Sequence, residues 1–236
     1  MKVRTSNVWY GARADISISE TGQMTPDNFN IWLKRGEIFL IHFLTGNITN
    51  AGNFPMPYET QKCKDYLKNF ITKKEVNNGF VLPDDYYQWD NLYKIGSYNA
   101  TIGCENEGDV KRVENCDKPI EILDGQEFKS RCTNEIEEMN PTLENPIAKI
   151  INSSVETEPT DVGSMRLEYI RYPKFGKLVM KKDEVFNTIV VDEDLSGELE
   201  WDMWALEYLI WKVKDYYYER TRNKSGFEFN STKKPE

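Results

Sequence analysis

The sequence has very little histidine and none of the common catalytic or nucleotide-binding signatures. Its 236 residues include a single histidine, His42. A Gly-x-Ser-x-Gly elbow, a Walker-type phosphate loop and a Gly-x-Gly-x-x-Gly fingerprint are all missing from the sequence. His42 lies in an apolar run between Phe39 and Phe43, where a packed helix residue is expected rather than a general base. We therefore predict that the chain is not an enzyme that uses nucleophilic or nucleotide chemistry.

The few cysteines do not form a metal-binding pattern. They are Cys63, Cys104, Cys116 and Cys132, and no two of them are spaced as Cys-x-x-Cys. Zinc sites usually bring their ligands in such close pairs. We predict no metal site and no cofactor, and reduced structural thiols are the expectation for a protein of the cytosol.

Long apolar runs are also missing. No run reaches the roughly 18–20 residues that a membrane-spanning helix needs. The first residues, Met1 to Thr5, do not lead into the apolar core of a signal peptide. These features predict a protein that makes no membrane contact and that stays in the cytoplasm where it is made or leaves by lysis.

Positive charge is in deficit. The chain has 30 Lys and Arg against 39 Asp and Glu, a net charge of −9 and a pI of about 4.9. Tight binding to duplex DNA or to an anionic membrane needs clustered Lys and Arg, so the balance opposes both. An acidic wall would let DNA slide past without sticking. The same balance also keeps a protein in solution, and composition alone does not separate these two interpretations.

The chain contains enough hydrophobic residues to form a hydrophobic core. Hydrophobic residues make up 39% of the chain and aromatic residues 13%, which argues against global disorder. The length allows one large domain or two small ones. We therefore expect a folded chain that needs no disulfides.

The N-terminal third predicts two helices. Thr25 is a suitable N-cap with Pro26 at the first helical position, and the helix is expected to run to about Thr45. A second helix is predicted from about Tyr58 to Ile71. Residues 1–24 are expected to form an N-terminal arm or a short edge strand.

The middle of the chain, residues 80–192, changes to short extended runs between turn residues. Asp124 and Gly125 suit a tight turn, and Phe175 with Gly176 suits another. Pro173 ends the clearest strand, because it has no N–H to donate to a ladder. The candidate strands are residues 93–102, 118–123, 165–172, 177–181 and 186–191.

An aromatic amphipathic helix is expected near the C-terminus. It begins near Ser196, where Glu198 and Glu200 would favour a helix start, and runs for about 22 residues. The predicted fold is a single α+β domain, with a helical body made from both ends of the chain and a β-rich insertion. The predicted parts are an arm at 1–24, the body at 25–79 and 195–222, the insertion at 80–194 and a polar tail at 223–236.

Several short motifs follow one another in an order that the physical patterns do not require. They are Thr25-Pro-Asp-Asn-Phe-Asn30, Leu82-Pro-Asp-Asp-Tyr86, Asn140-Pro-Thr142, Asn145-Pro-Ile147 and Tyr169-Ile-Arg-Tyr-Pro173. This order resembles the neck-ring, or head-to-tail connector, virion proteins of crAss-like tailed bacteriophages of Bacteroidetes. The resemblance covers about residues 22–215, whereas residues 1–21 and 223–236 lie outside it.

The resemblance implies a phage neck-adaptor-like fold and a non-catalytic structural role in the virion. It implies a ring, or homo-oligomer, expected to be a dodecamer, in the neck or tail of the particle. The implied partners are the portal protein and other neck or tail ring proteins. The viral genome would pass through the axial channel during ejection without specific binding.

Aromatic residues near both ends are candidates for contacts between subunits. Tyr216, Tyr217 and Tyr218 cannot all face one way on a helix, so at least one is expected to be exposed or to cover a partner. The interface candidates are Trp9, Tyr10, Tyr217, Tyr218, Phe227 and Phe229. Glu135, Glu137 and Glu138 are candidates for a channel lining, although a solvated charge run is the alternative for them.

Two other functions stay open from the residues alone. One is a small acidic protein-binding module, such as an inhibitor or an effector, that acts as a monomer or a dimer. The other is a glycoside hydrolase that depends on two carboxylates, for which Asp84 and Asp85, or Glu198, Glu200 and Asp202, are the candidates. A turn accounts for the first pair, and the start of a helix accounts for the second set.

Overall fold

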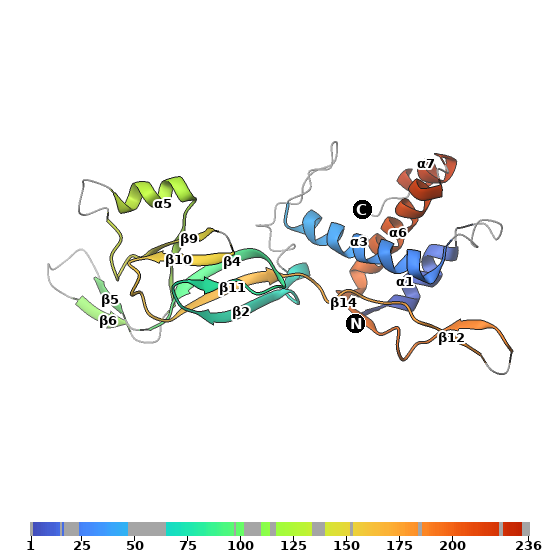
Figure 1. The fold of residues 1–236 in the computed structure, drawn as a ribbon, viewed down its shortest axis with the longest axis horizontal. Coiled ribbons are helices and arrows are strands. Elements are labelled where there is room, and N and C mark those ends of the chain that lie inside the picture. Colours follow the sequence, from blue (N-terminus) through green and yellow to red (C-terminus); the bar gives the residue numbers. More distant parts are fainter. Residues whose placement is uncertain are drawn as a thin grey trace. The chain divides into compact units, whose positions relative to one another are not determined.

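A computed structural model shows an α+β chain with a β-rich insertion between two parts that form a helical body (Figure 1). It describes residues 2–14, 16, 24–46, 65–96, 98–101, 110–113, 117–133, 140–151, 153–183, 186–221 and 224–232. The chain divides into two compact units. Unit 1 comprises Met1–Asn69 and Tyr172–Glu236, and unit 2 comprises Phe70–Arg171. Unit 2 is thus the insertion, with bounds that differ from the predicted 80–194.

The predicted first helix is confirmed in unit 1. Helix α3 spans Pro26–Leu44, and the Thr25 hydroxyl accepts a hydrogen bond from the Asn28 N–H at 3.3 Å. Thr45 caps its end, and Gly46 follows with a φ of 75°, which glycine adopts without strain. Local capping chemistry is enough to set both ends of this helix.

Helices from both ends of the chain build the core of unit 1. Helix α1 (Thr5–Ala14) and helix α3 both pack against α6 (Leu206–Thr221). The Trp9 and Phe29 rings meet edge to face at 5.1 Å. Gly11 lies where α1 approaches α6 so closely that a Cβ would overlap the side chain of Ile210. The helical body made from both chain ends, as predicted, is therefore confirmed.

The described residues of the expected arm and of the expected tail are largely helical. Residues 2–4 form strand β1 (Lys2–Arg4), and α1 follows directly. The strand predicted around Ile16 and Ile18 is not seen at Ile16, which lies buried in a bend, while Ile18 lies outside the described residues. Helix α7 (Lys224–Thr232) forms where the polar tail was predicted. The Trp211 side chain of α6 donates to the Asn230 carbonyl at 3.0 Å, and the Asn230 side chain donates to the Trp211 carbonyl at 3.1 Å.

The aromatic C-terminal helix starts later than predicted. Glu198–Asp202 form strand β14, a 3₁₀ turn η2 (Met203–Ala205) follows, and only then does α6 begin. Strand β14 pairs antiparallel with β1, which lies almost 200 residues earlier in the chain. Leu199 and Trp201 are buried and alternate with the acidic residues Glu198, Glu200 and Asp202. These acids made the period-2 pattern of a strand hard to recognise in the sequence. The predicted helix start at these acids is therefore wrong.

A two-stranded hairpin completes unit 1. Strand β12 (Met180–Lys182) pairs antiparallel with β13 (Ile189–Val191), with Met180 opposite Val191. Strand β13 lies within the predicted strand 186–191, whereas β12 begins later than the predicted strand 177–181 and ends one residue beyond it. In Figure 1 the hairpin extends away from the helices of its unit.

Unit 2 consists mainly of two four-stranded sheets. The first has the order β2-β11-β4-β7, and the second has the order β3-β10-β9-β8. A third, two-stranded sheet pairs β5 (Tyr98–Thr101) with β6 (Val110–Val113). The strands of the first sheet are Ile71–Val76, Met165–Arg171, Tyr86–Lys94 and Lys118–Pro119. Those of the second are Phe80–Val81, Ser154–Glu158, Ile147–Ile151 and Glu121–Ile122.

The two larger sheets share one hydrophobic core. Leu92 and Leu167 come from the first sheet, and Ala148 and Val155 come from the second. Pairing is antiparallel except between β8 and β9. The strand predicted to end at Pro173 is confirmed as β11, the central strand with the most extensive pairing.

Two local predictions in unit 2 are wrong. The predicted second helix extended to Ile71, but Ile71–Val76 is strand β2, paired with β11 from Ile71 opposite Ile170 onward. Residues 65–67 are helical, so the helix ends earlier. Asp124 and Gly125 do not form the predicted tight turn, because a helix begins at Gly125. The Asp124 carboxylate accepts from the Gln126 and Glu127 N–H groups, each at 2.8 Å, and caps helix α5 (Gly125–Cys132).

No helix among the described residues is both long enough and apolar enough to cross a bilayer.

Candidate interaction surface

The most exposed apolar side chains of unit 1 lie on the β12–β13 hairpin and at its base. Phe186 is 75% exposed, Ile189 77% and Leu195 67%. We call these three residues, together with the exposed lysines Lys177, Lys181 and Lys182, the hairpin surface. Large apolar side chains that remain this exposed are candidates for a contact with another molecule.

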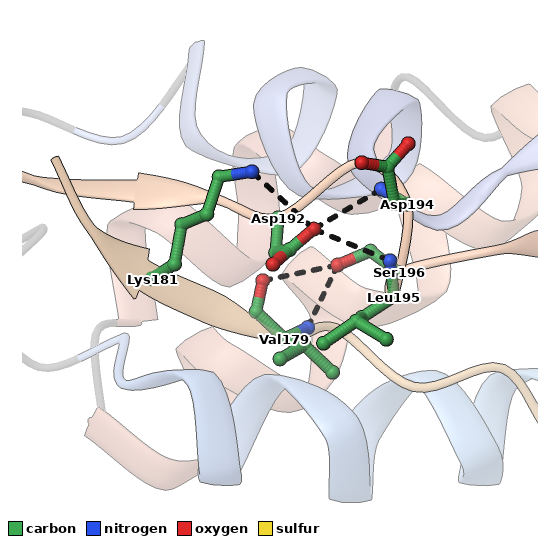
Figure 2. Close-up of polar contacts among 6 residues, drawn as sticks. All are labelled: Val179, Lys181, Asp192, Asp194, Leu195 and Ser196. Atoms are coloured by element: carbon green, nitrogen blue, oxygen red, sulfur yellow. Dashed lines mark hydrogen bonds and ion pairs between the residues drawn. The ribbon is translucent and has the colours of Figure 1, made fainter.

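The base of the hairpin is tied by side chains of its own sequence (Figure 2). Ser196 Oγ accepts from the Val179 N–H at 2.8 Å and donates to the Val179 carbonyl at 3.0 Å. The Asp192 carboxylate accepts from the Asp194 and Leu195 N–H groups, at 3.2 and 3.3 Å. These bonds hold the turn that carries Leu195 in one conformation.

Helix α3 holds the same base from the other side. The Asn30 side chain accepts from the Leu178 N–H at 2.7 Å and donates to the Leu178 carbonyl at 3.1 Å, as a neighbouring strand would. Glu37, about two turns further along α3, accepts from the Gly176 N–H at 3.1 Å. A Cβ at Gly176 would overlap the Leu199 side chain, so glycine is needed for this close approach. The base of the hairpin is thereby part of the core.

Glu37 is a buried carboxyl, with 0% exposure. Its second oxygen accepts from Trp201 Nε1 at 3.2 Å. Burial raises the pKa of Glu37 from 4.5 to about 7, and the nearby charge of Glu200 adds to the rise. The donors of Gly176 and Trp201 oppose it, because they stabilise the ionised form. Glu37 joins α3, β14 and the segment before β12, which is a structural task.

A short run of lysines leads into the hairpin of this acidic chain. The run from Lys174 to Lys182 contains four lysines and no acidic residue, although the whole chain carries −9. Lys181 lies 3.5 Å from Asp192. Within the part of the chain that the structure describes, Lys177 and Lys182 have no ion-pair partner. The hairpin surface thus contains exposed apolar groups and lysines. Residues 174–196 as a whole are not basic, because their four lysines are opposed by five acids, Asp183, Glu184, Asp192, Glu193 and Asp194.

The predicted interface residues differ in how far their side chains are exposed. Trp9, Tyr217 and Tyr218 are buried in the core of unit 1, whereas Tyr10 is 54% exposed. Tyr218 is covered by α7, since a Cβ at Gly226 would overlap its ring. The tyrosine that could not share the buried face is thus covered by the chain's own last helix, not by a partner.

Other predicted contact and channel residues lie where side chains are not described. Phe227 and Phe229 belong to α7, but only their backbone is described. Glu135, Glu137 and Glu138 lie outside the described residues. Their proposed roles at an interface and in a channel lining stay predictions.

The carboxylates considered for catalysis each have a structural partner or lie exposed. In unit 2, Asp85 accepts from the Tyr169 hydroxyl at 3.2 Å, and Asp84 is exposed. On β14, Glu200 accepts from the Lys174 N–H at 2.7 Å, and Asp202 accepts from Asn69 at 3.2 Å. Glu198, the third acid of β14, lies 3.9 Å from Arg4. This arrangement ties elements together and needs no substrate to account for it.

The two Asn-Pro motifs line a cavity of about 370 Å³ in unit 2. Lys118 donates to the Glu144 carbonyl and, at 2.8 Å, to Asn145 Oδ1. Arg131 lies 3.7 Å from Glu121 on the same wall. Lys118 of β7 therefore holds the loop that carries the second motif, and the Arg131–Glu121 pair joins α5 to β8.

No group of three or more His, Cys, Asp or Glu side chains that could hold a metal occurs among the described residues. Cys132, the one cysteine in the described ranges, has a free thiol, and burial followed by the charge of Glu158 raises its pKa. A raised pKa makes a thiol less reactive. Comparison with protein-family models and with curated proteins returns no match.

Sequence reasoning did not single out the hairpin surface. Residues 186–191 were expected to be a strand, but whether that strand would be covered depends on contacts that sequence does not show. The sequence does contain a four-lysine run at residues 174–182, but Asp183 and Glu184 separate this run from Phe186 and Ile189. Nothing in the sequence indicated that Glu37 would be buried, because an acid on an amphipathic helix is ordinarily exposed.

Proposed function

We propose that the chain is a non-catalytic structural protein of a phage virion, which assembles as a ring in the neck and joins the portal to the tail. The motif order that resembles crAss-like neck-ring proteins supplies this identity. The observation of the structure that best supports assembly is the hairpin surface, which presents apolar side chains from a base tied to the core. A ring needs such a surface on every copy.

The electrostatics support the proposed channel. With a net charge of −9, the ring would offer DNA little attraction, so the genome could move through the opening without being retained. The proposed partners are further copies of the chain, the portal and neighbouring ring proteins. Expected twelvefold symmetry comes from the resemblance.

A small acidic protein-binding module is the second candidate function. The exposed hairpin surface favours it equally, because an inhibitor or effector also needs an exposed contact. The two proposals differ in the number of copies that act together. A virion component is present in the particle in ring stoichiometry, whereas an inhibitor acts as one or two copies on its target.

Quantitative mass spectrometry of purified particles of the encoding phage tests the proposal. The proposed function predicts that the chain remains with the particle through density-gradient purification, in fixed ratio to the portal protein. An abundant chain in infected cells that is lost from purified particles would favour the inhibitor or effector instead. Turnover of a polysaccharide by the chain, abolished by Asp84→Asn or Glu200→Gln, would contradict a non-catalytic role.

A further inference from the structure

Strand β2 (Ile71–Val76) forms an open edge of the first sheet of unit 2. It is the outermost strand in the order β2-β11-β4-β7 (Figure 1). Its ladder with β11 runs without a bulge from Ile71 opposite Ile170 to Val76 opposite Met165. The side of β2 that faces away from β11 is therefore as regular as the paired side.

One hydrogen bond establishes which backbone groups of β2 face the open edge. The Arg171 N–H donates to the Phe70 carbonyl at 3.0 Å, and these two residues continue the register of the ladder. In an antiparallel ladder, hydrogen-bonded pairs alternate with pairs whose N–H and C=O groups point away from each other. The even-numbered residues of β2 are therefore bonded to β11, and the odd-numbered residues direct their groups outward. The outward residues are Ile71, Lys73 and Glu75.

These outward groups are available to another strand. Within the described ranges, no hydrogen bond reaches the backbone N–H or C=O groups of the three outward residues. Lys73, Lys74 and Glu75 are exposed, so this part of the edge lies in water. An exposed row of N–H and C=O groups is a template on which an extended segment can add as a further strand.

The lysines of β2 already have contacts inside unit 2. Lysine on an edge strand commonly discourages pairing. Here Lys73 Nζ lies 2.8 Å from Glu168 Oε1 of β11, and Lys74 Nζ lies 5.1 Å from the centre of the Phe80 ring. Glu75 has no ion-pair partner among the described residues. The edge thus presents a free carboxylate beside a partly neutralised lysine.

Two copies of β2 complement each other in one antiparallel register. Outward residues must lie opposite outward residues for their backbone groups to bond. A twofold axis at Lys74 meets this condition and places Lys73 of each copy opposite Glu75 of the other. Opposite charges directly across two strands stabilise the pair, whereas a shift by two residues would place Lys73 opposite Lys73 or Glu75 opposite Glu75. Lys74 meets its own counterpart on the other face, a repulsion that the two Lys73–Glu75 pairs outnumber.

From these observations we infer that β2 of a second copy adds to β2 of the first, antiparallel and across a twofold axis at Lys74. The two first sheets then join into one. This inference goes beyond the proposed function and does not rest on it. A twofold contact does not repeat around a ring that has the portal on one side and the tail on the other. The contact therefore belongs to the chain outside the particle, where it covers an edge that would otherwise allow non-specific pairing.

Charge reversal tests the register in the full-length chain. Lys73→Glu and Glu75→Lys are studied separately and as an equimolar mixture by sedimentation velocity, up to about 1 mM. Each variant alone places like charges opposite each other at both positions, so it should associate at least about tenfold more weakly than wild type. In the mixture, opposite charges meet again at both positions. The mixture should therefore associate about as tightly as wild type.

The matched controls are Lys129→Glu and Glu127→Lys, which change exposed residues of α5 in the same unit. They alter the net charge by the same amounts as the two β2 variants. Each control alone should associate like wild type, because α5 takes no part in the contact.

Amide hydrogen exchange resolved by residue locates the contact on β2. At low concentration the outward N–H groups of Lys73 and Glu75 should exchange fast, and at high concentration they should become protected. The Thr72 and Lys74 N–H groups point to β11 and serve as an internal control, because they should be protected at both concentrations.

Failure of this inference can be told apart from failure of the proposed function. A wild-type chain that stays monomeric up to about 1 mM overturns the β2 contact. So does a mixture that associates no more tightly than the separate variants, or association that leaves the Lys73 and Glu75 amides unprotected. Mass spectrometry of purified particles decides separately whether the chain is a virion component. A chain that pairs through β2 and is absent from particles would keep the contact and discard the function.

Discussion

At the scale of single residues, Glu37 shows how a charge can be placed in a core. Burial favours the protonated form of this carboxyl and raises its pKa, and the Gly176 and Trp201 N–H groups oppose that rise because they stabilise the ionised form. The folded chain therefore holds the proton up to about pH 7, whereas an unfolded chain releases it near 4.5. Between these values the folded state binds more protons, so stability falls as the pH rises.

Glu37→Gln removes this titration and is expected to change the pH dependence. In wild type the free energy of unfolding should lose up to about 3 kcal/mol between acidic and slightly alkaline pH through Glu37, and no more above that. The variant keeps one acceptor oxygen and loses the other. Its disadvantage relative to wild type should therefore be largest at acidic pH and shrink as the pH rises, as measured by urea unfolding at several pH values.

The control for Glu37→Gln is Glu207→Gln, which removes an exposed carboxyl from α6 in the same unit. Its unfolding curve should stay parallel to that of wild type across the pH range. If Glu37→Gln and wild type also differ by a constant amount at every pH, the buried carboxyl does not titrate as described here.

At the scale of elements, local chemistry predicts some boundaries and long-range pairing sets others. Helix α3 was predicted correctly because Thr25, Pro26 and Gly46 carry the end signals in their own sequence. Strand β14 was mistaken for helix because its partner, β1, lies at the other end of the chain. Strand β2 was missed for the same reason, since its ladder with β11 spans the whole insertion. Partners this distant leave no pattern in a short window of sequence.

The same limit applied to the candidate site. Aromatic character pointed to Trp9, Tyr217 and Tyr218 as contact residues, yet all three are buried. Trp9 and Tyr217 pack against rings of α3, and Tyr218 packs against α7, which was expected to be a tail. Exposure, which decides between core and interface, follows from tertiary packing and not from residue type. Tyr10 is the one aromatic candidate whose described side chain is largely exposed.

Asp124→Ala tests the local origin of helix α5. The change removes the acceptor for the Gln126 and Glu127 N–H groups and should destabilise the helix by about 1 kcal/mol. Amide hydrogen exchange should rise across Gly125–Cys132 and stay unchanged in the central strand β11. Gln126→Ala, which leaves the cap intact, is the matched control, and equal exchange in both variants would show that Asp124 does not cap the helix.

At the scale of the whole molecule, the insertion begins and ends at one place. Ile71 lies opposite Ile170, and the Arg171 N–H donates to the Phe70 carbonyl at 3.0 Å. Unit 2 therefore closes its own sheet, and its core draws on both of its four-stranded sheets. A segment with these properties has what an independently folding domain needs.

Residues 70–171 expressed alone are expected to fold. The fragment should unfold cooperatively in urea and give a dispersed amide NMR spectrum, because β2 and β11 pair within it. A shorter fragment, residues 78–171, loses β2 and the buried Val76 side chain and should be markedly less stable. An unfolded spectrum for the longer fragment would show that unit 2 depends on the rest of the chain.

The central claim is that many copies of the chain form a ring in the neck of a virion. Cryo-electron microscopy of purified particles, with the neck reconstructed under the symmetry of the portal, tests it most directly. The account predicts a ring between portal and tail whose subunit density fits unit 1 and unit 2. A fully assigned neck in which no density corresponds to this chain would contradict it.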